Sequence, residues 1–137
     1  MKRVFVDTNI LVDLIADRKP FSNFAIIIFS LAERDKLELF TSSHSIATTH
    51  YLLKKYIDEI QLREVLINLS ELIQIEGIHQ ETINTALRSN HKDFEDALQI
   101  TCASAIDKLD CIVTRNIKDF KNSRIPVFEP DELIKLL

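Results

Sequence analysis

Residues 4–9, Val-Phe-Val-Asp-Thr-Asn, decide the fold of this chain. A short run of β-branched and aromatic residues ends at the carboxylate of Asp7, and apolar residues then recur at helical spacing at positions 10, 11, 14 and 15. This pattern predicts a strand over 3–6 and a helix over 9–16, joined by a tight polar turn. In open α/β sheets, ligands bind at the carboxyl ends of the strands. Asp7 is therefore the first candidate site residue.

Residues 110–116, Asp-Cys-Ile-Val-Thr-Arg-Asn, repeat this arrangement near the other end of the chain. They predict a strand over 110–113, followed by a polar turn and a short helix over 117–120. If this strand lies beside the first one, Asn116 and Asp7 face the same crevice. The two polar strand ends then form one shared site.

Strands and helices alternate through the rest of the chain. The remaining predicted strands are short apolar runs, at 37–40, 73–75 and 126–128. The remaining predicted helices have apolar residues at helical spacing; they start at Pro20, after the capping residues 41–43, at 59–71, 78–88 and 93–108, and after Pro130. Such alternation predicts a three-layer α/β fold, a parallel sheet with helices on both faces. We expect a single domain over residues 1–137.

The composition narrows the class of protein. Hydrophobic residues make up 46% of the 137 residues, which is typical of a globular chain. A single glycine excludes the glycine-rich phosphate loops and the nucleophile elbow.

No apolar run approaches the roughly 18 residues of a membrane span, and Asp7 and Asp13 interrupt the N-terminal apolar stretch, so we expect a cytoplasmic protein with no membrane partner. Cys102 and Cys111 form no C-x-x-C pair and are expected to be free, buried thiols.

Acidic residues elsewhere in the chain can join Asp7. Asp93 and Asp96 lie three apart in the first turn of the helix predicted over 93–108, hence on one face, and Asp119 follows Asn116 by three residues. Carboxylates crowded into one crevice stay ionised together only if a cation offsets their charge. Their hard oxygen ligands suit Mg²⁺ or Mn²⁺, which could orient a water and neutralise a phosphodiester.

Each of these residues also has a purely structural interpretation. Asp93 is a natural N-cap with Asp96 at the third helical position, where a carboxylate suits the helix dipole. Thr8 and Asn9 could cap the helix over 9–16, and Thr114 could cap the one over 117–120. The global net charge of −4 gives no basic footprint for nucleic acid, although Arg115, Lys118, Lys121 and Arg124 cluster locally. Both interpretations stay open at this point.

The histidines show no metal-binding spacing such as H-E-x-x-H. His50 is the histidine whose helix we expect to border the crevice. Two other phosphate-handling classes fit poorly. A response-regulator receiver needs an acidic pair near the first strand and a lysine after the last one, and a haloacid-dehalogenase-type phosphatase needs Asp-x-Asp where this chain has Asn9.

Three segments, 4–14, 93–99 and 114–120, together resemble the PIN-domain family of metal-dependent ribonucleases, in particular its toxin-type, VapC-like members. The order and spacing of the segments agree over essentially the whole chain. The resemblance implies a five-stranded parallel sheet in the order 3-2-1-4-5, Mg²⁺ or Mn²⁺ as cofactor, RNA as substrate, and often a homodimer. Many members are toxins of bacterial toxin–antitoxin pairs, so an antitoxin protein is an implied partner.

The family's acidic cluster is reduced in this chain. Asp7 matches its first acid and Asp96 its third, whereas the fourth position is the amide Asn116 and the second aligns best with Thr48. A neutral ligand holds a cation less strongly than a carboxylate does. We therefore expect weak metal binding that needs millimolar Mg²⁺ or Mn²⁺.

The resemblance implies a metal-dependent endoribonuclease, and the reduced cluster leaves a catalytically weak or inactive RNA-binding or protein-binding module as the alternative. In the first hypothesis Asp7 and Asp96 ligate the metal and Asn116 assists them. The other implied site residues are the auxiliary acids Asp93 and Asp119, the supporting residues Thr8, Asn9, Thr48 and Thr114, and the RNA-backbone candidates Lys54, Arg115 and Lys118.

Overall fold

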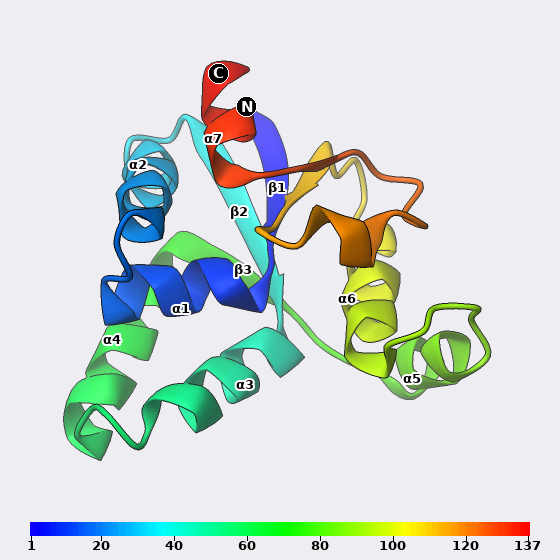
Figure 1. Cartoon of the computed structure of the whole chain (residues 1–137), viewed down its shortest axis with the longest axis horizontal. Coiled ribbons are helices and arrows are strands. Elements are labelled where there is room, and N and C mark those ends of the chain that lie inside the picture. The colour runs from blue at the N-terminus through cyan, green and yellow to red at the C-terminus, as the bar shows by residue number, and fades with distance from the viewer.

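The computed structural model describes residues 1–137 and contains one five-stranded parallel sheet (Figure 1). Its strand order is β3-β2-β1-β4-β5, as predicted. The strands are β1 (Lys2–Val6), β2 (Leu37–Ser42), β3 (Ile73–Glu76), β4 (Cys111–Val113) and β5 (Val127–Phe128). All four neighbouring pairs run parallel, so the carboxyl ends of the strands meet at one edge of the sheet.

Helices connect the strands in the predicted alternation. They are α1 (Thr8–Ala16), α2 (Phe21–Glu33), α3 (Ser43–Leu53), α4 (Glu59–Leu72), α5 (Gln80–Leu87), α6 (Phe94–Ser104), the 3₁₀ helix η1 (Ile117–Phe120) and α7 (Pro130–Lys135). The prediction for α6 was wrong at its C-terminal end, which was expected at Lys108. The chain instead turns after Ser104, with Lys108 at a φ of 57°, and the backbone N–H of Asp110 then bonds to the carbonyl of Arg3.

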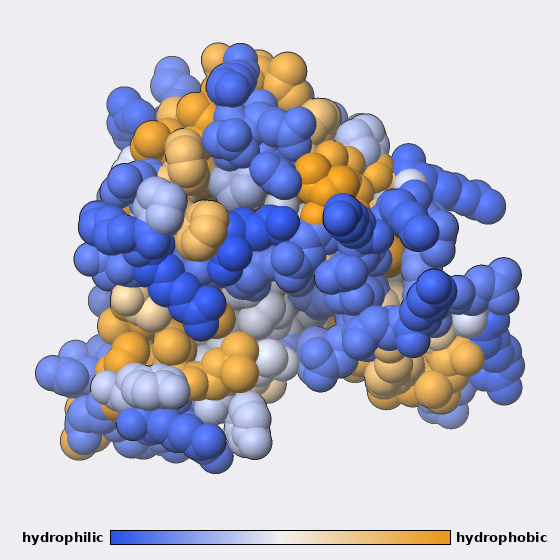
Figure 2. All heavy atoms as spheres, viewed as in Figure 1, coloured by the Kyte–Doolittle hydropathy of each residue, from blue (hydrophilic) through white to orange (hydrophobic).

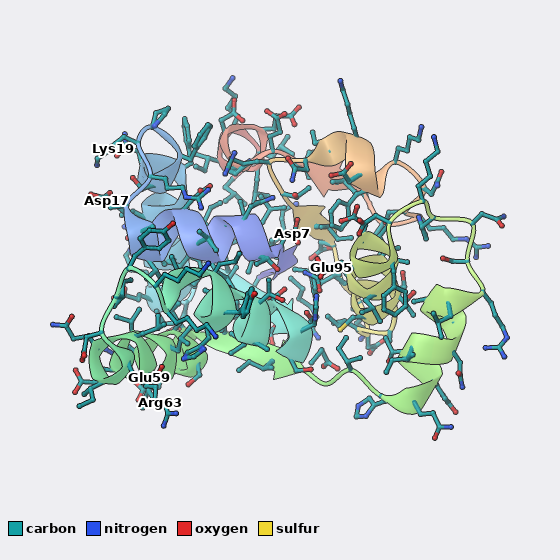
Figure 3. The ribbon with its side chains drawn as sticks, turned by 60° about the horizontal axis from the view of Figure 1, so that its bottom comes forward. Asp7, Asp17, Lys19, Glu59, Arg63 and Glu95 are labelled. Carbon is teal, nitrogen blue, oxygen red and sulfur yellow. The ribbon has the colours of Figure 1, made fainter.

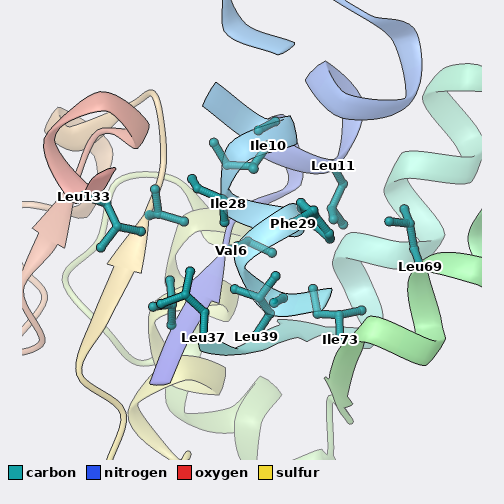
Figure 4. Close-up of a cluster of buried hydrophobic side chains, with 14 of the residues drawn as sticks. Val6, Ile10, Leu11, Ile28, Phe29, Leu37, Leu39, Leu69, Ile73 and Leu133 are labelled. Atoms are coloured by element: carbon teal, nitrogen blue, oxygen red, sulfur yellow. The ribbon is translucent and has the colours of Figure 1, made fainter. Parts of the chain in front are cut away.

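Alternating side chains of β1 divide the core between the two faces of the sheet. Val4 and Val6 belong to a cluster that α1, α2, α4 and α7 cover (Figure 4). Phe5 points to the opposite face, where it packs with Phe40 of β2 and with α6 and η1. A fully buried phenylalanine contributes about 2–3 kcal/mol of hydrophobic free energy, so the central strand is anchored from both sides.

Both cysteines are free and buried, as predicted. Burial raises the pKa of the Cys102 thiol to about 12 and that of Cys111 to about 11, so both stay protonated at neutral pH. None of the helices combines the length and the apolar character that crossing a bilayer requires.

The strand order reverses between β1 and β4, and this places the two polar strand ends side by side. The backbone N–H of Asp7 bonds to the carbonyl of Val113 at 3.0 Å, so the residues after β1 and β4 start from adjacent points. Crevices at such switch points are where open α/β sheets bind ligands.

Candidate active site

Asp7 is held by hydrogen bonds to both of its carboxylate oxygens. Oδ1 accepts from the backbone N–H of Thr8 at 2.8 Å and from Nε2 of Gln99 at 3.0 Å. Oδ2 accepts from the hydroxyl of Thr114 at 2.8 Å and from Nδ2 of Asn9 at 3.3 Å. Asp7, and not Thr8 or Asn9, is therefore the N-cap of α1. The backbone N–H of Thr8 and the hydroxyl of Thr114 thus both contact the Asp7 carboxylate, and a supporting role for these residues in catalysis stays a prediction.

A buried polar network behind Asp7 fixes Gln99. Its Nε2 also donates to the hydroxyl of Ser45 at 2.6 Å, and its Oε1 accepts from the hydroxyl of Ser42 at 2.5 Å. Ser42 is in turn the N-cap of α3 and accepts from the backbone N–H of Ser45 at 2.9 Å. One amide thus ties α6, α3 and the carboxylate of Asp7 together.

A cavity of about 240 Å³ opens beside Asp7 at the carboxyl edge of the sheet. It brings together six residues that the sequence singled out: Asp7, Thr8, Asn9, Thr48, Asp96 and Asn116. Figure 3 shows Asp7 beside α1 with Glu95 of α6 next to it, while the Glu59–Arg63 pair of α4 lies apart from them. The other lining residues are Val12, Arg18, His44, Leu52, Glu95 and Gln99.

The pKa of the Asp96 carboxyl group reflects the burial and the negative charge in and around this cavity. Burial raises its pKa first, and the neighbouring carboxylates of Asp93, Asp119, Asp7 and Glu95 raise it further, to about 7 from the usual 3.8. The helix cap predicted from the sequence is also present, because the backbone N–H of Asp96 bonds to Oδ1 of Asp93 at 3.0 Å. Structural capping and acidic clustering therefore coexist in the same residues.

The structure places other predicted site residues outside the cavity. Asp93, Asp119 and Lys118 line an adjacent groove, which shares Asp96 with the cavity. The ammonium group of Lys54 lies 4.8 Å from the ring centroid of Tyr51, at the end of α3. Its role at an RNA backbone stays a prediction.

Arg115 is engaged within the protein. Its guanidinium makes two bonds to the buried carboxylate of Asp13, at 2.6 and 3.0 Å, and stacks 4.0 Å from the ring centroid of Phe21. Its role at an RNA backbone also stays a prediction.

The sequence analysis did not identify several of the residues that line the cavity, because the fold brings them there from distant parts of the chain. Arg18 is the only arginine or lysine that lines the cavity, and it makes no ion pair. The expectation that the helix of His50 borders the crevice is confirmed, because His44, Thr48 and Leu52 of α3 line the cavity. His50 itself bonds to Glu59 at 2.9 Å, and the histidine that lines the cavity is His44. Its spacing of four residues from Thr48, on one helix face, could have indicated this.

The donor set fits a divalent cation of the hard, oxygen-binding kind. The carboxylates of Asp7 and Asp96 and the amide of Asn116 line one cavity. The two carboxylates repel each other, and a bound cation would offset their negative charge. No group of three or more His, Cys, Asp and Glu side chains converges as a metal cage. One or two carboxylates with retained waters is the arrangement that Mg²⁺ commonly accepts.

Comparison with known proteins identifies the family of this chain. The family model described as PIN domain matches residues 3–118. Ribonuclease VapC1 of Aquifex aeolicus (strain VF5) is 29% identical over 136 residues, which cover 96% of this chain and 92% of that protein.

Solved structures share the fold over most of its length. A toxin-antitoxin complex from Klebsiella pneumoniae superposes with a TM-score of 0.67 at 27% identity, covering 93% of this chain and 97% of that one. VapBC2 from Rickettsia felis, bound to a DNA fragment from its promoter, gives 0.65 at 20% identity, with 93% and 98% coverage. Mycobacterium tuberculosis VapC20, described as a Sarcin-Ricin loop cleaving toxin, gives 0.62 at 19%, with 80% and 86% coverage. This chain, with its 3-2-1-4-5 sheet and its carboxylates at the switch point, belongs to the PIN domain family and is similar to the VapC-type toxins within it.

Proposed function

We propose that this protein is a Mg²⁺- or Mn²⁺-dependent endoribonuclease of the VapC type, which hydrolyses RNA phosphodiester bonds. The observation that carries the proposal is the convergence of Asp7, Asp96 and Asn116 on one cavity at the switch point of the sheet. The similarity over nearly the full length to a protein named as a ribonuclease supports the same activity.

Each residue of the cavity has a defined part in this proposal. The carboxylates of Asp7 and Asp96 and the amide oxygen of Asn116 would hold the cation. When bound, the cation would supply the positive charge that activates a water and offsets the charge developing on the phosphate. Gln99 and Thr114 keep the Asp7 carboxylate in a fixed orientation. The unpaired guanidinium of Arg18 would contact the phosphate.

Glu95 is the candidate for the acid that the chain lacks at Thr48. Nε2 of His44 lies 3.4 Å from the hydroxyl of Thr48 and 3.8 Å from Oε1 of Glu95, so the three side chains lie close together. A carboxylate from α6 thus reaches the neighbourhood of Thr48. Glu95→Gln should lower the cleavage rate at least tenfold, whereas Glu81→Gln, an exposed position on α5, should leave it unchanged.

Calorimetry with Mn²⁺ tests the proposal directly. The wild-type protein should bind Mn²⁺ with millimolar affinity, and Asp7→Asn and Asp96→Asn should each abolish the heat and the cleavage of single-stranded RNA. Asparagine remains a good N-cap, so Asp7→Asn should still fold, which circular dichroism checks. Asp35→Asn, an exposed acid elsewhere, is the matched control.

A binding module without catalysis is the second candidate, and two observations favour it. Thr48 stands where the family has an acid, and both oxygens of Asp7 already accept hydrogen bonds from the protein. The absence of both Mn²⁺ heat and RNA cleavage at millimolar metal, with RNA binding retained, would establish this candidate and refute the first.

We also propose an antitoxin protein as partner and a homodimer as the assembly. Structures of relatives are described as toxin-antitoxin complexes. Light scattering of the purified chain should give twice its mass of 15.8 kDa. Expression of the chain alone should arrest growth of a bacterial host, and Asp7→Asn should relieve the arrest.

A further inference from the structure

A second polar groove adjoins the cavity. Its volume is about 420 Å³, and no hydrophobic residue lines it. It lies between the loop that precedes α6 and the segment around η1, and it meets the cavity at Asp96, which lines both. In Figure 2, hydrophilic side chains predominate where α6 faces this segment. The lining residues are Asn90, His91, Lys92, Asp93, Asp96, Lys118, Asp119, Lys121 and Asn122.

The lysines of this groove have no partner inside the protein. Lys92, Lys118 and Lys121 are exposed, and none of them forms an ion pair although carboxylates lie nearby. Asp93 is engaged as the N-cap of α6, where the positive end of the helix dipole offsets its charge. Lys92 lies on the α6 side of the groove and Lys118 and Lys121 lie on the η1 side, beside the carboxylates of Asp96 and Asp119. These free ammonium groups are suited to an anion that extends over several positions.

The lining chemistry selects the part of a nucleic acid that fits. Bases stack on aromatic or apolar surfaces, and the imidazole of His91 is the single such ring on the lining of this groove. Phosphates bind lysine ammonium groups and amides such as those of Asn90 and Asn122. The cavity itself differs, because Val12 and Leu52 give it apolar walls.

We infer that this groove carries the phosphate backbone of single-stranded RNA on one side of the cleaved bond, with Lys92, Lys118 and Lys121 as its phosphate contacts. The inference rests on the proposed ribonuclease function and specifies how its substrate lies. It extends the sequence-based prediction for Lys118 to a continuous track. The track leads directly to the scissile position because Asp96 borders both spaces.

The salt dependence of RNA binding tests the inference. In the Asp7→Asn background, which prevents cleavage, the dissociation constant for a labelled oligouridylate is measured between 50 and 300 mM KCl. Each phosphate contact on a single strand contributes about −0.7 to the slope of log K against log salt. The triple variant Lys92→Gln, Lys118→Gln, Lys121→Gln should flatten this slope by about 2 and weaken binding at least tenfold at 100 mM KCl.

Controls separate the failure of this inference from that of the function. Lys36→Gln with Lys135→Gln removes exposed lysines outside the groove and should keep the slope of the Asp7→Asn protein. If the triple variant behaves like this control, the groove is not the backbone track. If no variant binds RNA at all, the proposed function itself fails. Competition by polyglutamate as strong as that by oligouridylate of equal charge would indicate an acidic protein segment in the groove and overturn the inference.

Discussion

Gln99 shows how much of this site depends on a residue that does no chemistry itself. It is 3% exposed, and its amide satisfies Asp7, Ser42 and Ser45 at once. A buried polar group that loses its partner costs about 1–3 kcal/mol. Replacing this one amide therefore affects both the orientation of the carboxylate and the stability of the protein.

Gln99→Met should lower the free energy of unfolding by about 2–3 kcal/mol, because it leaves two buried serine hydroxyls and one carboxylate oxygen short of a partner. It should also weaken Mn²⁺ binding, since Asp7 loses one of the four hydrogen bonds that orient its carboxylate. Urea denaturation and calorimetry measure the two effects. Gln61→Met, on the exposed face of α4, should change neither quantity. An unchanged Mn²⁺ affinity in a folded Gln99→Met protein would contradict the positioning role.

Asp96 predicts a pH-dependent stability in metal-free protein. Its folded pKa of about 7 lies above the usual 3.8, so between these values the folded state holds a proton that the unfolded chain has released. The contribution of Asp96 to the free energy of unfolding therefore falls as the pH rises from 3.8 towards 7. Above pH 7 the carboxylate is ionised in the folded protein, and its full unfavourable effect is present. Asp96→Asn removes both the cost of burying the ionised carboxylate and its repulsion by the neighbouring acids. With screening of this partly exposed group allowed for, we expect a gain of about 1 kcal/mol at pH 8, or roughly 3 °C in Tm.

The comparison of thermal melts at pH 8 and pH 4.5 in EDTA checks this sign. The gain of Asp96→Asn over the wild type should disappear at pH 4.5, where Asp96 carries its proton. Asp35→Asn should show no such pH-dependent gain. A stabilisation by Asp96→Asn that is equal at both pH values would show that the ionised carboxylate is not its cause.

At the scale of single residues, the sequence predicted the acidic residues of the site but not the residues that hold them in place. Asp7 and Asn116 were found because each follows a strand, and Asp96 because it begins a helix. Gln99, Ser45 and Arg18 were not identified because their roles come from contacts across dozens of residues, which a local pattern does not contain. A glutamine between Leu98 and Ile100 on a buried helix was the one available signal.

Among the elements, the loop after β4 depends on the Asp13–Arg115 pair. Asp13 of α1 is 1% exposed, and its two short bonds to Arg115 join α1 to the loop that carries Thr114 and Asn116. The backbone N–H of Arg115 also bonds to Oδ1 of Asn9. The pair therefore sets the distance between the two polar strand ends.

Arg115→Met should destabilise the protein by about 3 kcal/mol, since it leaves the Asp13 carboxylate buried without its partner. It should also reduce cleavage more than the loss of folded protein explains, because Asn116 loses its fixed place. Arg124→Met, an exposed change in the same segment, is the control for stability and activity. Adding Asp13→Asn to Arg115→Met should recover part of the stability, and the absence of any recovery would refute the charge argument.

Element types followed from the sequence, whereas some boundaries did not. Apolar runs ending in polar turns marked β1 and β4, and Ser42 capped α3 within the predicted capping residues 41–43. The end of α6 was missed because the chain leaves the helix at Ala105 with no glycine or proline there, and Lys108 then adopts a positive φ before β4. Non-glycine residues at positive φ are uncommon and leave no sequence signal.

For the molecule as a whole, alternation of elements predicts a parallel sheet but not the order of its strands. The order 3-2-1-4-5 came from the family resemblance, and it is this order that places β1 between β2 and β4. The site follows from that arrangement, because a different order would have separated Asp7 from Asn116. The alternation of strands and helices was therefore predicted from physical principles, whereas the order of the strands was predicted from the resemblance to the family.

Divalent cations should stabilise the whole molecule through this site. A ligand that binds only the folded state at ten times its dissociation constant adds about 1.4 kcal/mol, which is roughly 3–5 °C in Tm for a domain of this size. We expect this rise for wild-type protein in 10 mM MnCl₂ relative to KCl of equal ionic strength. Asp7→Asn and Asp96→Asn should not respond. An equal rise in all three proteins would place the ion elsewhere.

The double duty of Asp7 has a consequence for how this protein can lose its activity. The same carboxylate starts the first helix and faces the cavity, so most replacements there would damage the scaffold together with the chemistry. Asparagine, serine and threonine keep a side-chain oxygen at the helix start while removing the negative charge. A silenced descendant that still needs its shape, for instance to occupy a binding partner, would therefore be expected to carry an amide or a small hydroxyl side chain at this place in the chain.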